Sequence, residues 1–473
     1  MKRVCAVVLV VASFGVATTP PAASKASTPE QWDPRVEKYV EFVEQHRKLE
    51  FEHPVRVEFL DDEAFVKAHQ GDDPEITKAD RREAERIAGQ LRALGLIEGS
   101  VDLIESERDL GATDTVGFYD QEKKALSVRG TDLSDTDVRI TLVHELTHAL
   151  QDQHFDLTKL DDTVETSGQD FALTALVEGD ATSVEDDYLF SLPAVEQDAY
   201  FADVPDDAPT AEAPDEASGS DIPPVLDLFT SGPYIYGSRY VEVLRQAGGQ
   251  ARLDRAFAHP PGTEEEIIDP VAARDARKPK RVNTPKLSAE EQRHGDADDF
   301  GALSLYLVLA SRIDPEVALR AAEGWGGDRY VGFTRRDTNS GECVRVALVG
   351  DTERDTGEMA DALAQWTAAV PAGAASSLPV GDRVELTACD SGATSASEDT
   401  LDAAVTLLVD RNDVALELMR SQAPPRVARC AGDQLAADPD FVALFDVEEE
   451  FNPTQEDQFT DLVGDAVGAC GAR

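Results

Sequence analysis

Apolar residues recur at helical spacing along the first half of the chain. This spacing predicts an amphipathic helix over 34–49, and further helices are expected over 80–94, 137–153 and 174–189. The run Val55–Leu60 instead alternates apolar and polar residues, which predicts a strand. Val116–Tyr119 and Ala125–Val128 flank the polar stretch Asp120–Lys124, so we expect a β-hairpin there.

The second half mixes helical and strand patterns. We expect helices at 236–246 and 252–258 on either side of Gly248-Gly249, a buried helix over 299–312, a helix over 358–369, and helices from Leu401 onwards. Strands are expected at 329–333, 344–349 and 383–386. Pro260–Pro270 should be extended, and Gly324–Tyr330 should form a glycine turn leading into a strand. The fold class predicted is α+β.

A basic and then apolar segment opens the chain. Lys2 and Arg3 precede the uncharged run Val4–Ala17, which is typical of a secretory signal peptide. Small residues favour cleavage after Ala17 or Ala26, and we take 1–26 as the signal peptide. The alternative is an uncleaved membrane anchor, for which the run is short. We therefore expect a secreted or extracytoplasmic protein, with no stable membrane insertion after cleavage.

Export places the remaining cysteines in an oxidising compartment, where pairing is favoured. They are Cys343, Cys389, Cys430 and Cys470, so two disulfides are expected, with three pairings possible. Pairing of nearest neighbours, Cys343 with Cys389 and Cys430 with Cys470, would close two local loops. The chain has no CxxC spacing, which argues against a metal held by cysteines.

The chain is strongly acidic, with 44 Lys and Arg against 93 Asp and Glu and a formal net charge of -49. This balance argues against a nucleic-acid partner and against docking on anionic lipid. Residues 160–238 hold no Lys or Arg but 19 Asp and Glu, and 203–221 are predicted to form a surface loop. Such a field favours basic peptide substrates and an accessory calcium (Ca²⁺) site. The alternative is an acid-rich exported protein whose loop is merely solvated.

The sequence LVHELTHALQ contains two histidines, His144 and His148, at positions i and i+4. On a helix they lie one above the other, so their imidazoles can bind one metal ion. Glu145 lies next to the first histidine and can reach a water on that ion as general base. The alternative is a buried helix whose histidines make ordinary hydrogen bonds.

A catalytic zinc (Zn²⁺) site needs a third protein ligand and an open fourth position. Glu178, in the run ALVEGDAT, is the favoured candidate because apolar neighbours surround it, and a carboxylate in such a place usually has a partner. His154 is the rival, since HExxHxxGxxH proteases place their third histidine ten residues after the first. Gln151 stands where that arrangement needs a glycine turn.

The runs HELTHALQDQ and EGDA resemble the gluzincin group of zinc metallopeptidases, specifically its secreted bacterial branch, over Val116–Val184. The resemblance implies a zincin-like fold, in which a small twisted sheet lies over the HExxH helix. It implies that His144, His148 and Glu178 bind zinc and that Glu145 is the base. It also implies that the hairpin Gly117–Val128 offers an edge strand to extended peptide substrates.

Some parts of such a site are less defined by the sequence. The thermolysin pattern places an aspartate four residues after the ligand glutamate, where this chain has Thr182, so Asp180 and Glu185 are the candidate partners of the histidines. For the donor that stabilises the oxyanion, the run GPYIYG offers Tyr234 or Tyr236, and we take Tyr236. The alternative for either tyrosine is aromatic packing.

These expectations define four regions along the chain. A signal peptide (1–26) precedes a zincin-like metallopeptidase domain (27–290) that includes the acidic loop 203–221. An α/β extension (291–395) and a small helical region closed by a disulfide (396–473) follow. The function expected is hydrolysis of peptide or protein substrates by a metal-activated water. The alternative function is a non-catalytic extracellular binding or envelope-associated protein on the same scaffold.

Overall fold

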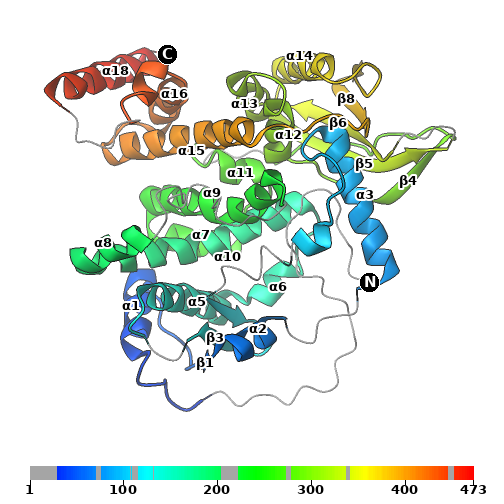
Figure 1. The fold of residues 1–473 in the computed structure, drawn as a ribbon. Helices are drawn as coiled ribbons and strands as arrows, with labels where there is room; N and C mark the ends of the chain where they lie inside the picture. Colours follow the sequence, from blue (N-terminus) through cyan, green and yellow to red (C-terminus); the bar gives the residue numbers. More distant parts are fainter. Residues whose placement is uncertain are drawn as a thin grey trace.

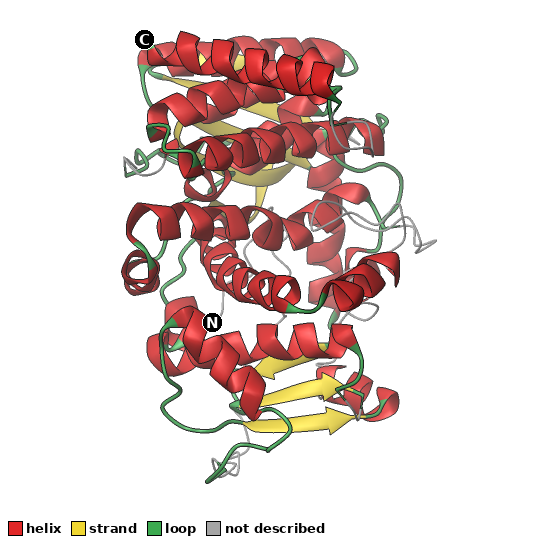
Figure 2. Cartoon of the chain, turned by 90° about the vertical axis from the view of Figure 1, so that its left-hand side faces the viewer, coloured by secondary structure: helices red, strands yellow, loops and turns green. Residues whose placement is uncertain are grey.

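The computed structural model describes residues 29–70, 76–106, 108, 116–130, 133–203, 222–272, 278–336, 341–445 and 452–472. The expected signal peptide lies outside these residues, as does the expected loop from residue 204 to 221. The described chain has a mixed α+β fold with two separate sheets. Helices fill the space between the two sheets, which lie towards opposite ends of the molecule (Figures 1 and 2).

The smaller sheet belongs to the N-terminal part of the chain. Its strands are β1 (Arg56–Leu60), β2 (Gly117–Asp120) and β3 (Ala125–Arg129), in the order β1-β3-β2. β2 pairs antiparallel with β3, which confirms the expected hairpin, and it forms one edge of the sheet. Three helices accompany the sheet, namely α1 (Glu37–Arg47), α2 (Asp62–Gln70) and α5 (Thr136–Phe155). Apolar residues of α1, α5 and β3 share one buried cluster, so α5 lies firmly on the sheet.

The central layer is helical and includes the longest helices of the described chain. Its members are α6 (Leu157–Asp161), α7 (Ser167–Ser191), α8 (Ala194–Asp203), α9 (Pro224–Gly248), α10 (Gln250–Ala258) and α11 (Glu264–Ile268). α7 and α9 cross where Gly179 meets Gly237, and a Cβ on either glycine would collide with the backbone of the opposite helix. The missing side chains therefore allow the two helix backbones to touch.

The larger sheet is antiparallel throughout, in the order β4-β5-β6-β8-β7. Its strands are β4 (Glu291–Asp298), β5 (Trp325–Arg335), β6 (Cys343–Gly350), β7 (Ala375–Val380) and β8 (Arg383–Cys389). The helices around it are α3 (Lys78–Leu94), α12 (Ala302–Ala310), α13 (Pro315–Glu323) and α14 (Glu353–Ala369). One buried cluster joins residues of α3 and α9 to residues of this sheet. The proposed boundary at 290/291 therefore runs through a continuous core, and it stays a prediction.

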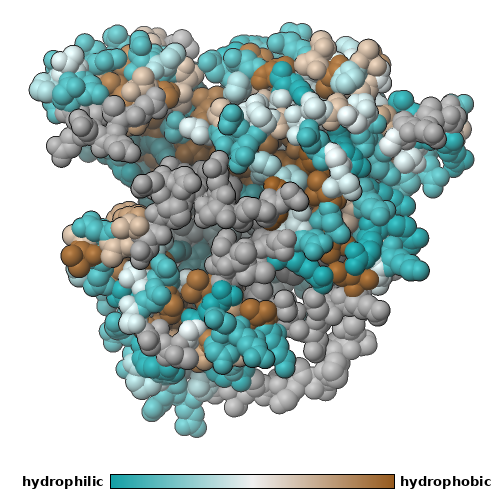
Figure 3. Space-filling view, viewed as in Figure 1, coloured by the Kyte–Doolittle hydropathy of each residue, from teal (hydrophilic) through white to brown (hydrophobic). Residues whose placement is uncertain are grey.

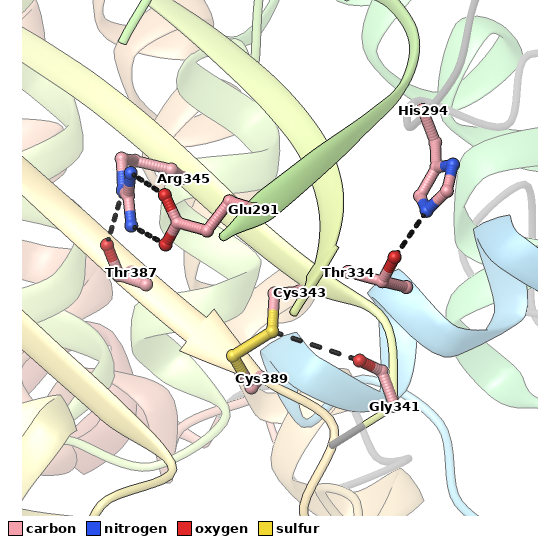
Figure 4. The surroundings of a disulfide bond; sticks show 8 residues. All are labelled: Glu291, His294, Thr334, Gly341, Cys343, Arg345, Thr387 and Cys389. Atoms are coloured by element: carbon pink, nitrogen blue, oxygen red, sulfur yellow. Dashed lines mark hydrogen bonds and ion pairs between the residues drawn. A yellow bond between two sulfur atoms is a disulfide. The ribbon is translucent and has the colours of Figure 1, made fainter. Parts of the chain in front are cut away.

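The C-terminal region is helical, as expected, and comprises α15 (Glu398–Arg420), α16 (Pro425–Ala436), α17 (Pro439–Val442) and α18 (Pro453–Gly471). A disulfide between Cys430 and Cys470 joins α16 to α18. A second disulfide joins Cys343 to Cys389, which face each other across β6 and β8 (Figure 4). Both bonds have the expected nearest-neighbour pairing.

Three local expectations are wrong. The segment Pro260–Pro270 is not simply extended, because Thr263 caps the short helix α11 inside it. The GWGG run is not a turn, since β5 already begins at Trp325 and carries an irregularity between Trp325 and Gly327. The helix expected from residue 236 begins at Pro224, with Pro233 inside it. In the first case a local side-chain cap outweighs the flanking prolines. In the other two, pairing with β6 and contact with α7 override the local signal of glycine or proline.

Polar side chains cover most of the face in Figure 3. Apolar side chains are exposed at Phe190, Val195 and Phe201, at the end of α7 and along α8. None of the helices in the described ranges is long and apolar enough to span a membrane.

Candidate metal centre

Helix α5 carries the HExxH residues and is well bounded by the sequence. Asp135 accepts a hydrogen bond from the backbone N–H of Asp137 at its N-terminus, and Asp156 ends it in the left-handed conformation with φ 58°. His144 and His148 are one turn apart on this helix, and their side chains are 10 % and 12 % exposed. The two imidazoles are therefore largely buried but remain within reach of solvent.

Three side-chain atoms converge at this point. The Nε2 atoms of His144 and His148 lie 3.0 Å apart, and each lies 3.2 Å from Oε2 of Glu178. Zinc–ligand distances of about 2.0–2.1 Å in a tetrahedral site give a separation of about 3.3 Å between ligand atoms. Two imidazole nitrogens and one carboxylate oxygen with nearly this spacing fit the protein ligands of a zinc ion.

Glu178 reaches the histidines because α7 is fixed at two places. Next to it, Gly179 lies against Gly237 of α9. At the N-terminus of α7, the carboxylate of Asp299 accepts hydrogen bonds from the Gly168 N–H and the Thr166 hydroxyl, at 3.2 and 2.8 Å. Since Asp299 lies next to the end of β4, the larger sheet helps to hold the helix that carries Glu178.

Glu145 lies next to the edge strand β2. Its carboxylate accepts a hydrogen bond from the backbone N–H of Tyr119, and a Cβ on Gly117 would be 3.3 Å from Glu145 Cγ and 2.8 Å from Thr141 Cγ2. One ligand atom each from His144, Glu145 and His148 lie within 4.8 Å of one another. Burial raises the pKa of Glu145, although both histidines oppose this. Such a carboxylate is well placed to accept a proton.

The second nitrogen of each imidazole also has a partner. Nδ1 of His144 lies 2.7 Å from Oε2 of Glu185, which the sequence offered as a candidate. Nδ1 of His148 lies 3.0 Å from Oε1 of Gln151, and Gln151 in turn donates to Asp180 at 2.9 Å. Sequence reasoning did not foresee this role of Gln151. The sequence feature that could have indicated it is the i+3 spacing of Gln151 from His148, which places both residues on one helix face.

The structure separates the two candidate tyrosines and the rival ligand. The Tyr234 hydroxyl donates to Glu178, and its ring lies 6.2 Å from that of His144. Tyr236 is instead buried in the main core, away from the histidines, so the structure does not bring it to the site. His154 is not brought there either, because its Nε2 lies 2.8 Å from the carbonyl oxygen of Glu50. On one unbroken helix, positions 144 and 154 face different ways.

Charge around the cluster favours an ionised carboxylate. Burial alone would raise the pKa of Glu178, but His148 and His144 outweigh it and hold this pKa well below its usual range. Burial would lower the pKa of His144, yet Glu178 and Glu185 raise it. The charge of Glu178, helped by burial, raises the pKa of Tyr234, so its hydroxyl keeps its proton. The donor set thus holds a negative ligand and a neutral hydroxyl side by side.

A family model described as a domain of unknown function (DUF8575) matches residues 290–417. No curated protein and no solved structure matches the chain. The matched segment includes the whole of the larger sheet and most of α15. His144, His148 and Glu178 lie outside it, so the likeness concerns the part of the chain that caps α7 and not the histidine cluster.

Proposed function

We propose that the protein is a secreted, zinc-dependent metallopeptidase of the gluzincin type, with a zincin-like catalytic domain. The observation that carries the proposal is the triangle formed by His144 Nε2, His148 Nε2 and Glu178 Oε2, with sides of 3.0, 3.2 and 3.2 Å. Its atoms have the chemistry and spacing of a three-residue zinc site. The two disulfides fit an exported protein.

Two further residues supply the remaining chemistry. A zinc ion, when bound, lowers the pKa of a water and polarises a carbonyl group. The carboxylate of Glu145 accepts the proton as that water attacks the peptide carbonyl, and it then passes the proton to the leaving amine. The Tyr234 hydroxyl, which donates to Glu178 in this structure, would exchange that hydrogen bond for one to the developing oxyanion. Tyr234 is 41 % exposed, so a substrate can reach it.

The edge strand β2 supports a peptide as the substrate. Arg129 N–H donates to the Val116 carbonyl, and hydrogen-bonded pairs alternate along an antiparallel ladder. The backbone groups of Gly117 and Tyr119 therefore point away from β3, towards the open edge. The Tyr119 N–H already bonds to Glu145, which places this edge next to the base. An extended peptide added to β2 would have its carbonyl groups beside Glu145.

The charge next to the cluster supports a preference for basic peptides. Glu185 contacts His144, and Asp186 follows it on α7. Burial, together with the charges of Glu185 and Asp187, raises the pKa of Asp186 to about 6. A basic side chain of the substrate would relieve this repulsion. The expected accessory calcium site has no second supporting observation in the described residues, and the loop expected at 203–221 lies almost wholly outside them.

Substitution of the base tests the proposal. Glu145→Gln should keep one zinc ion per chain and lose peptide hydrolysis by about 10²-fold or more, because the amide cannot accept the proton. Glu358→Gln, at an exposed position on α14, serves as the matched control. Hydrolysis by Glu145→Gln at the parent rate would contradict the assigned base. A parent protein that binds zinc but hydrolyses no peptide would favour the non-catalytic binding protein.

A further inference from the structure

A chain of hydrogen bonds leads away from His148 into the protein interior. Nδ1 of His148 lies 3.0 Å from Oε1 of Gln151. The amide nitrogen of Gln151 donates to the carbonyl oxygen of Val177 at 3.0 Å and to Oδ2 of Asp180 at 2.9 Å. A carbonyl and a carboxylate can only accept, so they fix which end of the Gln151 amide faces His148. His148 then donates from Nδ1, so in its neutral imidazole the lone pair is on Nε2, which lies 3.0 Å from His144 Nε2 and 3.2 Å from Glu178 Oε2.

The far end of the chain is a buried ion pair. Arg47 Nε lies 2.8 Å from the same Oδ2 of Asp180, and both side chains are fully shielded from solvent. Arg47 also donates to Gln250 at 2.7 Å and to Asp254 at 3.2 Å. These contacts tie α1 and α10 to α7. Because a guanidinium keeps its charge at any ordinary pH, Arg47 stays paired with the Asp180 oxygen that accepts from Gln151.

We propose that Gln151, Asp180 and Arg47 are positioning residues that hold His148 in the Nδ1–H tautomer, with Nε2 directed at the zinc site. This inference rests on the proposed function only in naming the metal. It also accounts for Thr182, which stands where the thermolysin pattern has an aspartate. Here Gln151 of α5 lies between His148 and Asp180 of α7 and bonds to both. His144 needs no such bridge, since Glu185 contacts its Nδ1 directly at 2.7 Å.

Selective ¹⁵N labelling of histidine tests the inference without any catalytic assay, and the chain has only 8 histidines to resolve. In the metal-free protein, the His148 Nδ1–H should be protected from exchange. Gln151→Leu should abolish this protection and weaken zinc binding about 10–100-fold. The matched control is Gln153→Leu on the same helix, because Gln153 bonds to the backbone of Glu52 and His53 instead. It should keep the protection and bind zinc within about twofold of the parent.

A pair of charge-changing substitutions, at Gln151 and Asp180, distinguishes a positioning role from a purely structural one. It also tests the proposal if Gln151→Leu fails to fold. Gln151→Glu places a second carboxylate against Asp180 and should weaken zinc binding more than tenfold. Adding Asp180→Asn restores a donor opposite the new carboxylate. The double variant should therefore recover most of the lost zinc affinity, which a merely structural role does not predict.

The outcomes distinguish this inference from the proposed function. Unchanged protection of His148 in Gln151→Leu, or no recovery in the double variant, would overturn the positioning role. A parent protein that binds zinc but hydrolyses no peptide would overturn the peptidase while leaving the labelling result intact. Loss of protection together with weaker zinc binding supports the positioning role whether or not any peptide is cleaved.

Discussion

Gly179 of α7 and Gly237 of α9 lie face to face, and neither position has room for a Cβ. The two glycines lie beside residues of the proposed site, since Glu178 precedes Gly179 and Tyr234 is three residues before Gly237. The close crossing of α7 and α9 therefore sets how far the carboxylate of Glu178 lies from the hydroxyl of Tyr234. In this protein, one backbone contact positions two side chains of the proposed site at once.

Gly179→Ala should push the two helices apart. The added methyl group meets backbone atoms of Gly237, which cannot rotate away, so we expect a loss of about 3 kcal/mol in the free energy of unfolding. Zinc affinity should fall as well, because Glu178 moves with α7. Urea unfolding and zinc titration measure the two effects.

The matched control for that change is Gly357→Ala, in the N-terminal half of α14. Its Cβ would have no neighbour within 4 Å, so the alanine should stabilise the protein by about 0.5–1 kcal/mol through helix propensity. Equal behaviour of Gly179→Ala and Gly357→Ala would show that the contact with Gly237 does not matter.

Tyr234→Phe should lower kcat about 10²-fold while zinc stays bound, because a donor to the oxyanion is lost. Tyr236→Phe makes the same chemical change two residues away on α9, but in the main core, and should leave kcat within about twofold. Peptide hydrolysis with both variants, together with zinc analysis, decides the matter. A larger loss of kcat in Tyr236→Phe than in Tyr234→Phe would show that Tyr236, the residue expected from the sequence, is the donor to the oxyanion.

Much of the fold could be predicted because local signals and tertiary structure agree. The helices α1 and α3 follow an apolar period that packing preserves, and Gly95 ends α3 with φ 75°. The hairpin of β2 and β3 and the pairing of the four cysteines beyond the expected signal peptide follow in the same way. In the candidate site, the HExxH spacing places two imidazoles on one helix face before any tertiary contact is known.

The remaining features depend on contacts between distant segments. β4 was not predicted, because its sequence Glu291–Asp298 is polar and is paired by β5. The choice between Tyr234 and Tyr236 depends on how α9 is rotated against α7, which the local sequence does not reveal. The role of Arg47 depends on a contact with Asp180 across 133 positions of sequence. No local pattern contains such a pairing.

The Arg345–Glu291 pair gives a prediction for pH (Figure 4). Both guanidinium Nη atoms contact the Glu291 carboxylate, at 2.8 and 3.0 Å, and they lower its pKa from 4.5 to about 2. Because the pKa is lower in the folded state, the ion pair stabilises the protein at pH values above the pKa of the unfolded chain. This stabilisation is lost as the pH falls from 4.5 towards 2. Glu291→Gln should lower the free energy of unfolding by about 2–3 kcal/mol at pH 7 and by almost nothing near pH 2.

Urea unfolding of the parent and of Glu291→Gln at both pH values measures the difference. Glu358→Gln removes a partner from the exposed pair with Arg354 and should cost less than about 0.5 kcal/mol at either pH. A cost of Glu291→Gln that is the same at pH 7 and at pH 2 would contradict the assigned ion pair.

The zinc content of three purified proteins tests the central claim most directly. The parent chain and His154→Ala should each bind one zinc ion, because His154 contacts Glu50 and not the cluster. Glu178→Ala should lose at least 10²-fold in zinc affinity, since it removes one of the three ligands. Equilibrium dialysis with metal analysis measures all three. A parent chain without zinc, or a Glu178→Ala variant that binds zinc as tightly as the parent, would contradict the proposed metal site.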